Sequence, residues 1–375
     1  MTQPDPLIIV GGGQSGLAAA RAALDAGLRP VVLHAGAEPV GSWPRYYDSL
    51  TLFSPARHSA LPGMPFDGDP DRYPHRDEVV DYLRRYAAAL DVEVRTRTRA
   101  VAVRSTPGGG YLVRTDTGDE LAGIGVVAAT GSYANPYVPS LPGQDEYGGD
   151  LRHVADYHHP DGYAGKRVVV VGAGNSAVQV AYELTGHARV TLATREPVRF
   201  LPQRIGGRDL HHWLHVTRGD RLPRAVITRL VRHATVLDTG RYRQAVTSGE
   251  LARREMFTRF TPDGVVWSDG THDAVDAVIF ATGYRPDLNY LAPLDTLEHG
   301  TPRQVGGIST THPGLVYLGL EFQRSFASNT LRGVGRDAAH VMEALAAQAG
   351  DRPRLGKQRH RRAAAQLRRD TAGRH

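Results

Sequence analysis

The chain has 375 residues, of which 41% are apolar and 22% are charged. This is the ordinary composition of a globular protein, and the length predicts two or three domains. The absence of cysteine excludes disulfides, thiolate metal sites, thiol nucleophiles and electron transfer through a redox-active cysteine pair.

The basic residues are concentrated near one end of the chain. The formal net charge is +6, but residues 351–375 contain nine Lys or Arg and only two Asp, which leaves a net charge of −1 for the preceding 350 residues. A nucleic-acid-binding protein more often carries its basic residues on a folded face, so we expect a neutral body, a basic tail and no nucleic-acid partner. No apolar run approaches the roughly 20 residues of a membrane-spanning helix, and the first residues lack a basic signal segment. We therefore expect a cytoplasmic protein without an integral membrane segment.

The first predicted elements are a strand, a glycine turn, a helix and a second strand. The apolar run 7–10 precedes Gly11-Gly12-Gly13-Gln14-Ser15-Gly16, an Ala-rich segment continues to about residue 26, and a second apolar run follows at 31–33. In such a turn the first glycine allows a tight bend, the second admits a pyrophosphate to the backbone, and the third lets the helix pack close to the strand. The motif therefore predicts a dinucleotide site.

The residue expected to bind the ribose of this nucleotide departs from the common pattern. An acidic side chain usually stands at the end of the second strand, but this sequence has His34 there. His34 and Glu38 are both candidates for the contact, and the pattern does not decide between them.

Between residues 92 and 127, short alternating runs are broken by glycine turns, which predicts a small antiparallel meander. Residues 134–165 are rich in Pro and Gly and predict a connector.

A second strand, glycine turn, helix and strand follow at 167–192, with Gly172, Gly174 and Ala177 at the positions of the three glycines. Two such units in one chain imply two dinucleotides, a flavin and a nicotinamide. The second unit ends in Thr194-Arg195, and an arginine at this position accommodates a ribose 2′-phosphate. The second nucleotide is therefore expected to be NADPH.

The remaining segments carry weaker patterns. Residues 205–260 mix Arg, His and Leu at helical spacing, apolar runs at 277–280 and 315–318 predict buried strands, and a helix is expected from about 334 to 349. His211 and His215 are four residues apart, but no third ligand has suitable spacing, so we predict no metal site. The chain lacks a Gly-x-Ser-x-Gly motif, so serine hydrolysis is not predicted.

Several further segments resemble signatures of the flavin-containing monooxygenases, the class B flavoprotein monooxygenases, and their small bacterial members in particular. They are Ala129-Thr130-Gly131 with Pro136, Pro139 and Gly143; Tyr147, Gly149, His153 and Tyr157 of the family fingerprint; Phe280-Ala281-Thr282-Gly283-Tyr284; Gly41-Ser42-Trp43 with Tyr47-Asp48-Ser49-Leu50; and 315–319 with Gly333-Val334-Gly335-Arg336-Asp337.

The resemblance implies an α/β fold with two Rossmann-like dinucleotide-binding domains and the small antiparallel β meander. The NADPH-binding domain, 146–275, is expected to be inserted in an FAD-binding domain made of residues 1–145 and 276–350, followed by the basic tail 351–375. The cofactor-binding candidates for FAD and NADPH are Gly11, Gly13, Gln14, Ser15, Gly16, His34, Glu38, Trp43, Val101, Thr130, Gly131, Gly172, Gly174, Asn175, Ser176, Ala177, Thr194, Arg195, Thr282, Gly283, Gly335 and Asp337.

The same resemblance implies the reaction. NADPH would reduce FAD, and O2 would form a C4a-(hydro)peroxyflavin that oxygenates a small organic molecule at a heteroatom or a carbonyl carbon. Arg57 and Ser54, beside the expected flavin edge, are the candidates for catalytic contacts. Phe53 stands where many members have an asparagine, which makes the chain similar to the indole-pyruvate branch.

Two other functions remain open at this point. A reductase of the ferredoxin-reductase type binds the same two nucleotides and needs no cysteine, and a non-catalytic redox sensor could keep the glycine turns. The fingerprint at 147–157 favours the oxygenase. The expected partners are a small-molecule substrate and O2, a homodimer is left open, and no short pattern encodes the substrate.

Overall fold

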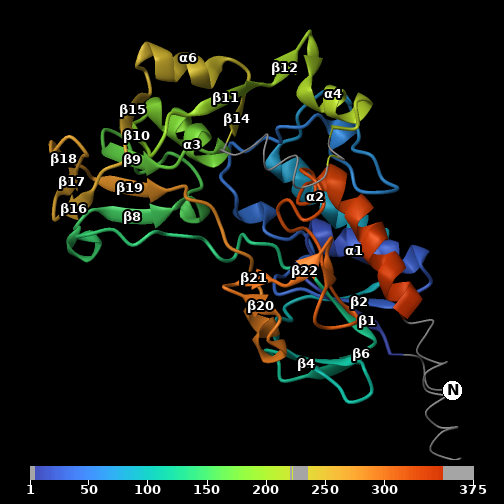
Figure 1. Ribbon diagram of the computed structural model, residues 1–375. Coiled ribbons are helices and arrows are strands. Elements are labelled where there is room, and N and C mark those ends of the chain that lie inside the picture. The colour runs from blue at the N-terminus through green and yellow to red at the C-terminus, as the bar shows by residue number, and fades with distance from the viewer. Residues whose placement is uncertain (1–4, 220–221, 223–234, 349–375) are drawn as a thin grey trace, which may run out of the picture.

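The computed structural model describes residues 5–219, 222 and 235–348. The expected basic tail, 351–375, lies outside the described residues. Two parallel sheets form the centres of two α/β units (Figure 1), as the paired glycine turns predicted. Within the described ranges, no helix is both long and apolar enough to cross a membrane.

The sheet of the first unit combines strands from both ends of the chain. Its strands are β1 (Leu7–Val10), β2 (Pro30–Leu33), β3 (Glu93–Arg95), β7 (Gly125–Ala128), β22 (Gln304–Val305), β23 (Ile308–Ser309) and β24 (Leu315–Tyr317). Their order is β22-β23-β24-β7-β1-β2-β3, and the pairs from β24 to β3 are parallel. The chain thus returns to its first sheet after some 180 residues spent elsewhere.

Alternating side chains of β1 supply two separate cores. Leu7 and Ile9 pack with three helices on one face, whereas Ile8 and Val10 pack with the meander on the other, as expected for a strand whose successive side chains point to opposite faces. The helices are α1 (Gln14–Asp25), α2 (Arg76–Ala88) and 331–348; the meander is β4 (Ala100–Ser105), β5 (Tyr111–Thr115) and β6 (Glu120–Gly123).

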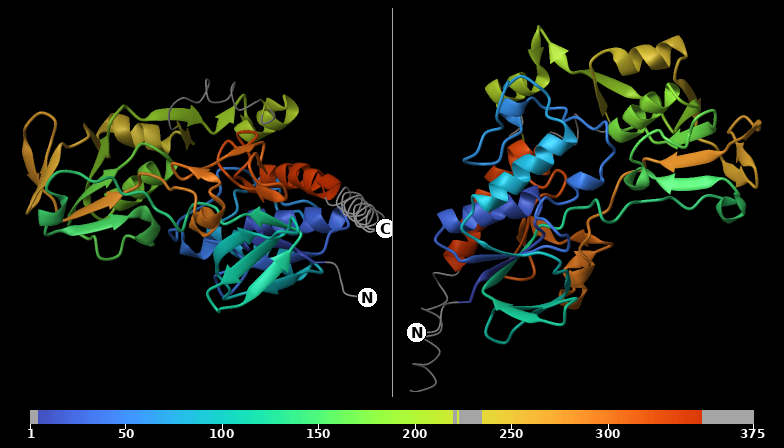
Figure 2. Two further views of the ribbon diagram at one scale, coloured as in Figure 1. Left: turned by 60° about the horizontal axis from the view of Figure 1, so that its bottom comes forward. Right: turned by 180° about the vertical axis from the view of Figure 1, so that it is seen from behind.

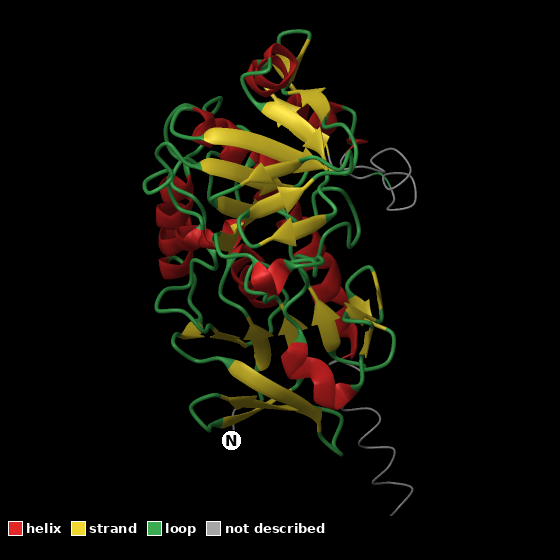
Figure 3. Ribbon diagram, turned by 90° about the vertical axis from the view of Figure 1, so that its left-hand side faces the viewer, coloured by secondary structure: helices red, strands yellow, loops and turns green. Residues whose placement is uncertain are grey.

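The second unit is built around a sheet of five parallel strands. They are β8 (Asp150–His153), β9 (Arg167–Val171), β10 (Arg189–Thr194), β15 (Ala252–Glu255) and β19 (Ala277–Phe280), in the order β15-β10-β9-β19-β8. Helices α3 (Asn175–Thr185) and α6 (Arg241–Ser248) pack on one face, and the hairpins of β16 (Arg259–Thr261), β17 (Gly264–Val266) and β18 (His272–Ala274) pack on the other. Figure 3 shows this sheet above the first one, with the meander at the bottom.

The pairing of β19 differs from the expected domain boundary at 275/276. β19 lies between β8 and β9, with Phe280 in register with His153 and with Val171. Because this strand fills the centre of the second sheet, the chain leaves the second unit after Phe280 and not before Ala277. Part of the expected Pro- and Gly-rich connector, 150–153, is also a strand of this sheet.

An excursion between β10 and β15 reaches from the second unit towards the first (Figures 1 and 2). It contains β11 (Arg199–Pro202), β12 (Arg204–Ile205), β13 (Arg208–Asp209), α4 (Leu210–Val216) and β14 (Thr235–Asp238). The Tyr73 hydroxyl donates to Asp209 Oδ2 (2.6 Å), and Gln203 Nε2 donates to the Phe53 carbonyl (2.7 Å), so the excursion is attached to the first unit.

The remaining elements are short. They are β20 (Leu297–Glu298), β21 (Thr301–Pro302) and the 3-10 helices η1 (Trp43–Arg45), η2 (Ala56–His58), η3 (Gln144–Glu146), η4 (Val154–Asp156) and η6 (Asn289–Leu294).

Candidate functional site

The first glycine loop brings β1, α1 and a neighbouring loop into very close contact. Gly11 has φ of +112°, and a Cβ at Gly16 would lie 1.7 Å from the Gly11 carbonyl oxygen, so neither position accepts a side chain. A Cβ at Gly13 would lie 3.1 Å from the Gly41 Cα. Gly13 is also the N-cap of α1 and supplies no side-chain cap, so no N-cap side chain satisfies the first N–H groups of the helix.

Three predicted residues meet beside this loop. The Trp43 indole N–H donates to Gln14 Oε1 (3.1 Å), and Gln14 Nε2 donates to the Asn329 carbonyl (2.8 Å). Ser15 is buried against Gly319, where a Cβ would lie 2.1 Å from the serine Oγ. Asn329, which no sequence motif singled out, thus joins the C-terminal part of the chain to the first glycine loop.

His34 follows β2 and contacts the glycine loop directly. The Gly12 N–H donates to His34 Nδ1 (3.3 Å). Burial lowers the pKa of His34, although a hydrogen bond to the Glu38 backbone opposes this, and the neutral ring suits an accepting Nδ1. The Glu38 carboxylate instead pairs with Arg84 Nη2 (2.8 Å) on α2.

The second glycine loop repeats the arrangement with more open space. Gly172 has φ of +142°, and a Cβ there would lie 2.5 Å from the Ala281 carbonyl oxygen. Gly174 caps α3 with an extended backbone, and a Cβ there would have no atom within 4 Å. Protein packing therefore does not explain Gly174, whereas room for a ligand at the start of α3 does.

The side chains after this loop connect the two units. Asn175 Oδ1 accepts a hydrogen bond from the Leu237 N–H (3.0 Å), and Ala177 is fully buried. The Tyr47 hydroxyl, from the first unit, hydrogen-bonds with Ser176 and donates to Gln179 Oε1 on α3. Burial, the largest effect, raises the pKa of Tyr47, so its phenol stays a neutral donor.

The end of β10 carries the predicted phosphate-binding pair. Thr194 is buried, and its Oγ1 accepts from Arg253 Nε (2.7 Å) on β15. Arg195 is exposed and forms no ion pair with any residue that the structure describes. Sequence reasoning missed Arg253, because only the parallel pairing of β15 with β10 brings it to Thr194.

Thr130, Gly131, Thr282 and Gly283, all predicted to bind cofactor, lie in the two segments of the chain that connect the units. Thr130 Oγ1 donates to the Asp287 carbonyl (2.6 Å), and the Asp287 N–H donates to the Gly131 carbonyl (3.0 Å). Thr282 Oγ1 donates to the Tyr137 carbonyl, and the Tyr137 N–H donates to the Gly283 carbonyl (3.0 Å). These four residues therefore fix how the chain passes between the units.

The fingerprint residues are buried and make structural contacts. Tyr147 donates to the Val275 carbonyl (3.0 Å), His153 Nε2 lies 3.1 Å from the Gly283 carbonyl oxygen, and Tyr157 donates to Glu183 (2.8 Å). The fingerprint thus stabilises the second unit and its junction.

Three other predicted cofactor contacts lie on separate elements. Val101 is 38% exposed at a register shift in β4. A Cβ at Gly335 would lie 2.4 Å from Pro62 Cγ, and Asp337 Oδ1 accepts from Arg324 Nη1 (3.1 Å). Gly335 therefore allows close helix packing, and Asp337 is held by an ion pair within the first unit.

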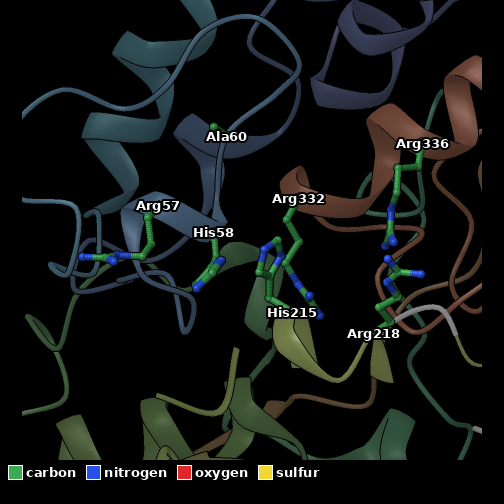
Figure 4. A pocket seen from close by; sticks show the side chains of 7 residues that line it. All are labelled: Arg57, His58, Ala60, His215, Arg218, Arg332 and Arg336. Carbon is green, nitrogen blue, oxygen red and sulfur yellow. The ribbon is translucent and has the colours of Figure 1, made fainter. Parts of the chain in front are cut away.

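A cavity of about 420 Å³ lies where the two units meet (Figure 4). Side chains from η2, from the end of α4 and from helix 331–348 line it: Arg57, His58, Ala60, His215, Arg218, Arg332 and Arg336. Of the two catalytic candidates, Arg57 is at this cavity and pairs with Asp71 (2.7 Å). Ser54 is buried, and its hydroxyl lies 2.8 Å from that of Ser59, so its place is in the loop and not on the cavity wall.

Asp209 supports one wall of the cavity. Burial opposes its ionisation, but hydrogen bonds from His211, Tyr73 and Gln203 outweigh burial and lower the pKa of Asp209. His211 pairs with Asp209 (2.8 Å), whereas the rings of His215 and His58 are 5.5 Å apart. The two histidines that are four residues apart therefore have different partners.

His58 is held uncharged at the cavity. Burial, followed by the charges of His215, His211 and Arg332, lowers the pKa of His58 from 6.5 to about 4. Its Nε2 is buried and has no hydrogen-bond partner among the described residues.

This pKa predicts acid sensitivity. An unfolded chain takes up a proton on His58 below pH 6.5, whereas the folded protein does so only near pH 4, so stability falls as pH falls through this window. We expect Tm to decrease between pH 6.5 and 4, and to decrease less in His58→Gln, as measured by thermal unfolding of the holoenzyme. Equal pH dependence in the two proteins would show that His58 does not titrate in this way.

Comparisons with known proteins agree with this geometry. The model of the pyridine nucleotide-disulphide oxidoreductase family matches residues 8–319. The chain is 33% identical over 313 residues to the indole-3-pyruvate monooxygenase YUCCA1 of Oryza sativa subsp. japonica, covering 75% of this chain and 77% of that protein. It is 30% identical to an uncharacterized CzcO-like oxidoreductase of Geobacillus kaustophilus, covering 80% and 86% of the two chains.

A solved structure extends the likeness to the whole fold. The flavin-containing monooxygenase from Stenotrophomonas maltophilia has a TM-score of 0.81 and 31% identity, covering 93% of this chain and 100% of that one. Together with the two glycine loops, these likenesses favour an oxygenase over a ferredoxin-type reductase. The chain therefore belongs to the pyridine nucleotide-disulphide oxidoreductase family and is a flavin-containing, NADPH-dependent monooxygenase.

Proposed function

We propose that the first glycine loop binds FAD, that the second binds NADPH, and that a small organic substrate enters the cavity between the units. The main observation in favour of NADPH at the second loop is the unfilled space beside Gly174. Gly174 has no packing reason to be a glycine, and Arg195 stands exposed at the end of the neighbouring strand. A pyrophosphate at α3 and a ribose 2′-phosphate at Arg195 would fill both places.

The first loop fits FAD for a related reason. The N–H groups that open α1 have no side-chain cap, and the Gln14, Trp43 and Asn329 network holds the surrounding loops in place. We assign Gly11, Gly13, Gly16, Ser15, His34, Glu38, Val101, Thr130, Gly131, Gly335 and Asp337 to the same FAD-binding unit. His34, through its ring, is the candidate for the ribose, because Glu38 pairs with Arg84.

Held at the first glycine loop, FAD would supply the redox and oxygen chemistry of the reaction, with NADPH at the second loop as the hydride donor. The chain's own residues position the reactants and exclude water. Tyr47 joins the FAD-binding unit to α3, and Asp209 joins the excursion to the loop that carries Tyr73. Thr282 and Gly283, with Thr130 and Gly131, hold the linking segments together, which keeps the two nucleotide sites in a fixed relation.

The reaction is tested by adding candidate substrates to the holoenzyme and measuring NADPH and O2 consumption together with oxygenated product and hydrogen peroxide. Product formed in proportion to NADPH supports the proposal. NADPH oxidation that yields peroxide alone with every sulfide, amine, ketone and keto acid tried would contradict it.

The Arg195→Ala variant tests the assignment of NADPH to the second loop. We expect its KM for NADPH to rise about tenfold or more, since loss of one phosphate contact costs about 1.4 kcal/mol or more, whereas its KM for NADH should change little. Arg189→Ala, at the exposed start of the same strand, is the matched control and should behave like the wild type. An equal loss with both nucleotides would contradict a role for Arg195 in binding the 2′-phosphate.

We further propose a domain division that follows strand pairing, with the NADPH-binding unit ending after Phe280. We also propose a cytoplasmic location. The sequence leaves a homodimer open, and size-exclusion chromatography with light scattering would test it.

A further inference from the structure

Exposed apolar side chains gather at one place in the excursion between β10 and β15. Ile205 on β12 is 44% exposed, and Trp213 and Val216 on α4 are 39% and 60% exposed. The Trp213 indole N–H donates to the Ile205 carbonyl (2.9 Å), and Val216 follows Trp213 by about one helical turn on the same side of α4. Apolar side chains that a fold leaves together in water commonly mark a contact with another surface.

The hairpin that carries Ile205 is tightly defined. Gly206 and Gly207 have φ of +57° and +75° and form the two-residue loop between β12 and β13, which is typical of a type I′ hairpin. Ile205 is paired with Arg208, so the two side chains lie on one face of the hairpin. The hairpin projects from the molecule with α4 beside it (Figure 1), so a broad surface can reach its tip.

The charged residues around this tip are almost all basic. Residues 199–219 contain four arginines and one acidic residue, Asp209. The Asp209 carboxylate is buried and hydrogen-bonds with three neighbouring side chains, so it does not pair with Arg204, which stands opposite it in the hairpin. Arg204 and Arg208 are exposed and form no ion pair with any residue that the structure describes. We call the whole set the tip surface: Arg204, Ile205, Arg208, Trp213 and Val216.

A lipid bilayer fits the tip surface better than a protein partner does. Each partner of a specific protein interface contributes about 20–30 residues, whereas the tip surface has five on a narrow hairpin and one short helix. A symmetric contact with a second copy would place these arginines against each other, and like charges repel. Apolar and aromatic side chains flanked by arginine are typical of segments that lie among the headgroups of an anionic bilayer.

Trp213 is suited to leave water. A buried tryptophan needs an acceptor for its indole N–H, and the Ile205 carbonyl already supplies one within the protein. The ring can therefore enter an apolar medium without losing a hydrogen bond.

We propose that the tip surface docks the protein peripherally on a bilayer that contains anionic phospholipid. Ile205, Trp213 and Val216 enter the headgroup region, and Arg204 and Arg208 pair with lipid phosphates. This docking goes beyond the proposed reaction and does not depend on it, because it uses none of the residues assigned to the two nucleotides.

Co-sedimentation of the holoenzyme with vesicles is the first test. The vesicles contain phosphatidylcholine, either alone or mixed with the anionic phosphatidylglycerol. We expect binding to the mixed vesicles to be about tenfold tighter or more, since each basic residue near an anionic surface adds a factor of about five, and to weaken as salt is added. Equal binding to the two compositions, or no binding to either, would overturn the proposal.

Tryptophan fluorescence locates the contact. Trp213 is the most exposed of the three tryptophans, since Trp267 is buried and Trp43 is half-buried. Phosphatidylglycerol vesicles with acyl chains brominated near the headgroup should quench the emission of Trp213, and Trp213→Phe should lose this quenching. Quenching that persists in Trp213→Phe would place the contact elsewhere and contradict the assignment.

Substitutions test the apolar and the basic parts of the tip surface separately. Ile205→Asp should weaken binding to the mixed vesicles about tenfold, because it removes apolar area and adds a charge that anionic lipid repels. Arg204→Gln combined with Arg208→Gln should weaken it about twentyfold. Val305→Asp, at a 73% exposed residue of β22, and Arg104→Gln, at an exposed residue of β4, are the matched controls and should bind like the wild type.

Two further outcomes would give the binding or the surface to something else, and each would overturn the proposal. Vesicle binding that Ile205→Asp and the double arginine variant leave unchanged would belong to another basic segment, such as residues 351–375. A lipid-free wild type that is dimeric by light scattering, with a monomeric Ile205→Asp, would assign the tip surface to a second copy. Flavin content and reduction by NADPH in solution should be the same in all these variants as in the wild type, which shows that they are folded and separates this inference from the proposed function.

Discussion

Gly174→Val is expected to leave the protein folded and yellow but to slow its reduction by NADPH about a hundredfold or more, the size of effect that small misplacements of a reactant produce. Gly174 has φ of −89° and ψ of −177°, which any residue adopts, and a Cβ there meets no atom within 4 Å. The valine side chain would therefore enter the space that we assign to the NADPH pyrophosphate, and its Cβ would meet no protein atom. Anaerobic stopped-flow measurement of flavin reduction checks this result.

Two controls isolate the effect. Gly108→Val places the same side chain in open space at the meander turn and should be reduced at the wild-type rate. Photochemical reduction, which needs no nucleotide, should proceed normally in Gly174→Val. A Gly174→Val protein that NADPH reduces at the wild-type rate would show that the nucleotide does not lie against this loop.

The two dinucleotide units were predictable because local chemistry alone specifies them. Gly11 and Gly172 are required by left-handed backbone, and Gly16 by contact with the Gly11 carbonyl, so each turn is encoded within six residues. The position of β19 could not be predicted in the same way, because an apolar run such as 277–280 fits the centre of either sheet. Only pairing with β8 and β9 decides between the sheets.

The cavity was beyond sequence reasoning for a different reason. His58, His215 and Arg332 meet at one place although more than 100 residues separate each from the next, and no spacing rule connects them. Ser54 and Arg57 are neighbours in sequence, yet one is tied to Ser59 within its loop and the other lines the cavity. The short helix η2 turns the chain between them, and its path depends on tertiary contacts such as the Ala56 N–H bond to the Arg72 carbonyl.

The fingerprint residues make structural contacts within the protein. Tyr147, His153 and Tyr157 are buried, and each has a hydrogen-bond partner in the second unit or at the junction. These contacts give the three residues a structural role in the second unit and at its junction with the first. Arg253, in contrast, lies beside Thr194 at the nucleotide loop and belongs to no recognisable pattern.

Gly13→Val is expected to yield protein with little or no FAD. Gly13 has φ of −86° and ψ of −169°, so valine strains no dihedral angle, but its Cβ would lie 3.1 Å from the Gly41 Cα. The two loops would have to separate, and overpacking of this kind costs about 1–3 kcal/mol. The valine methyl groups would also occupy the space before the uncapped N–H groups of α1, where we place the flavin pyrophosphate.

The measurement is the ratio of flavin to protein absorbance after purification, followed by titration of the apoprotein with FAD. Circular dichroism is needed to show that the variant is folded, because an unfolded protein would lose FAD whether or not Gly13 lies at the FAD site. Gly174→Val is the matched control, since it makes the same substitution at the corresponding position of the other loop and should keep its flavin. If Gly13→Val kept its flavin and Gly174→Val lost it, the two nucleotides would have to exchange loops, because each substitution blocks one helix N-terminus and leaves the other open.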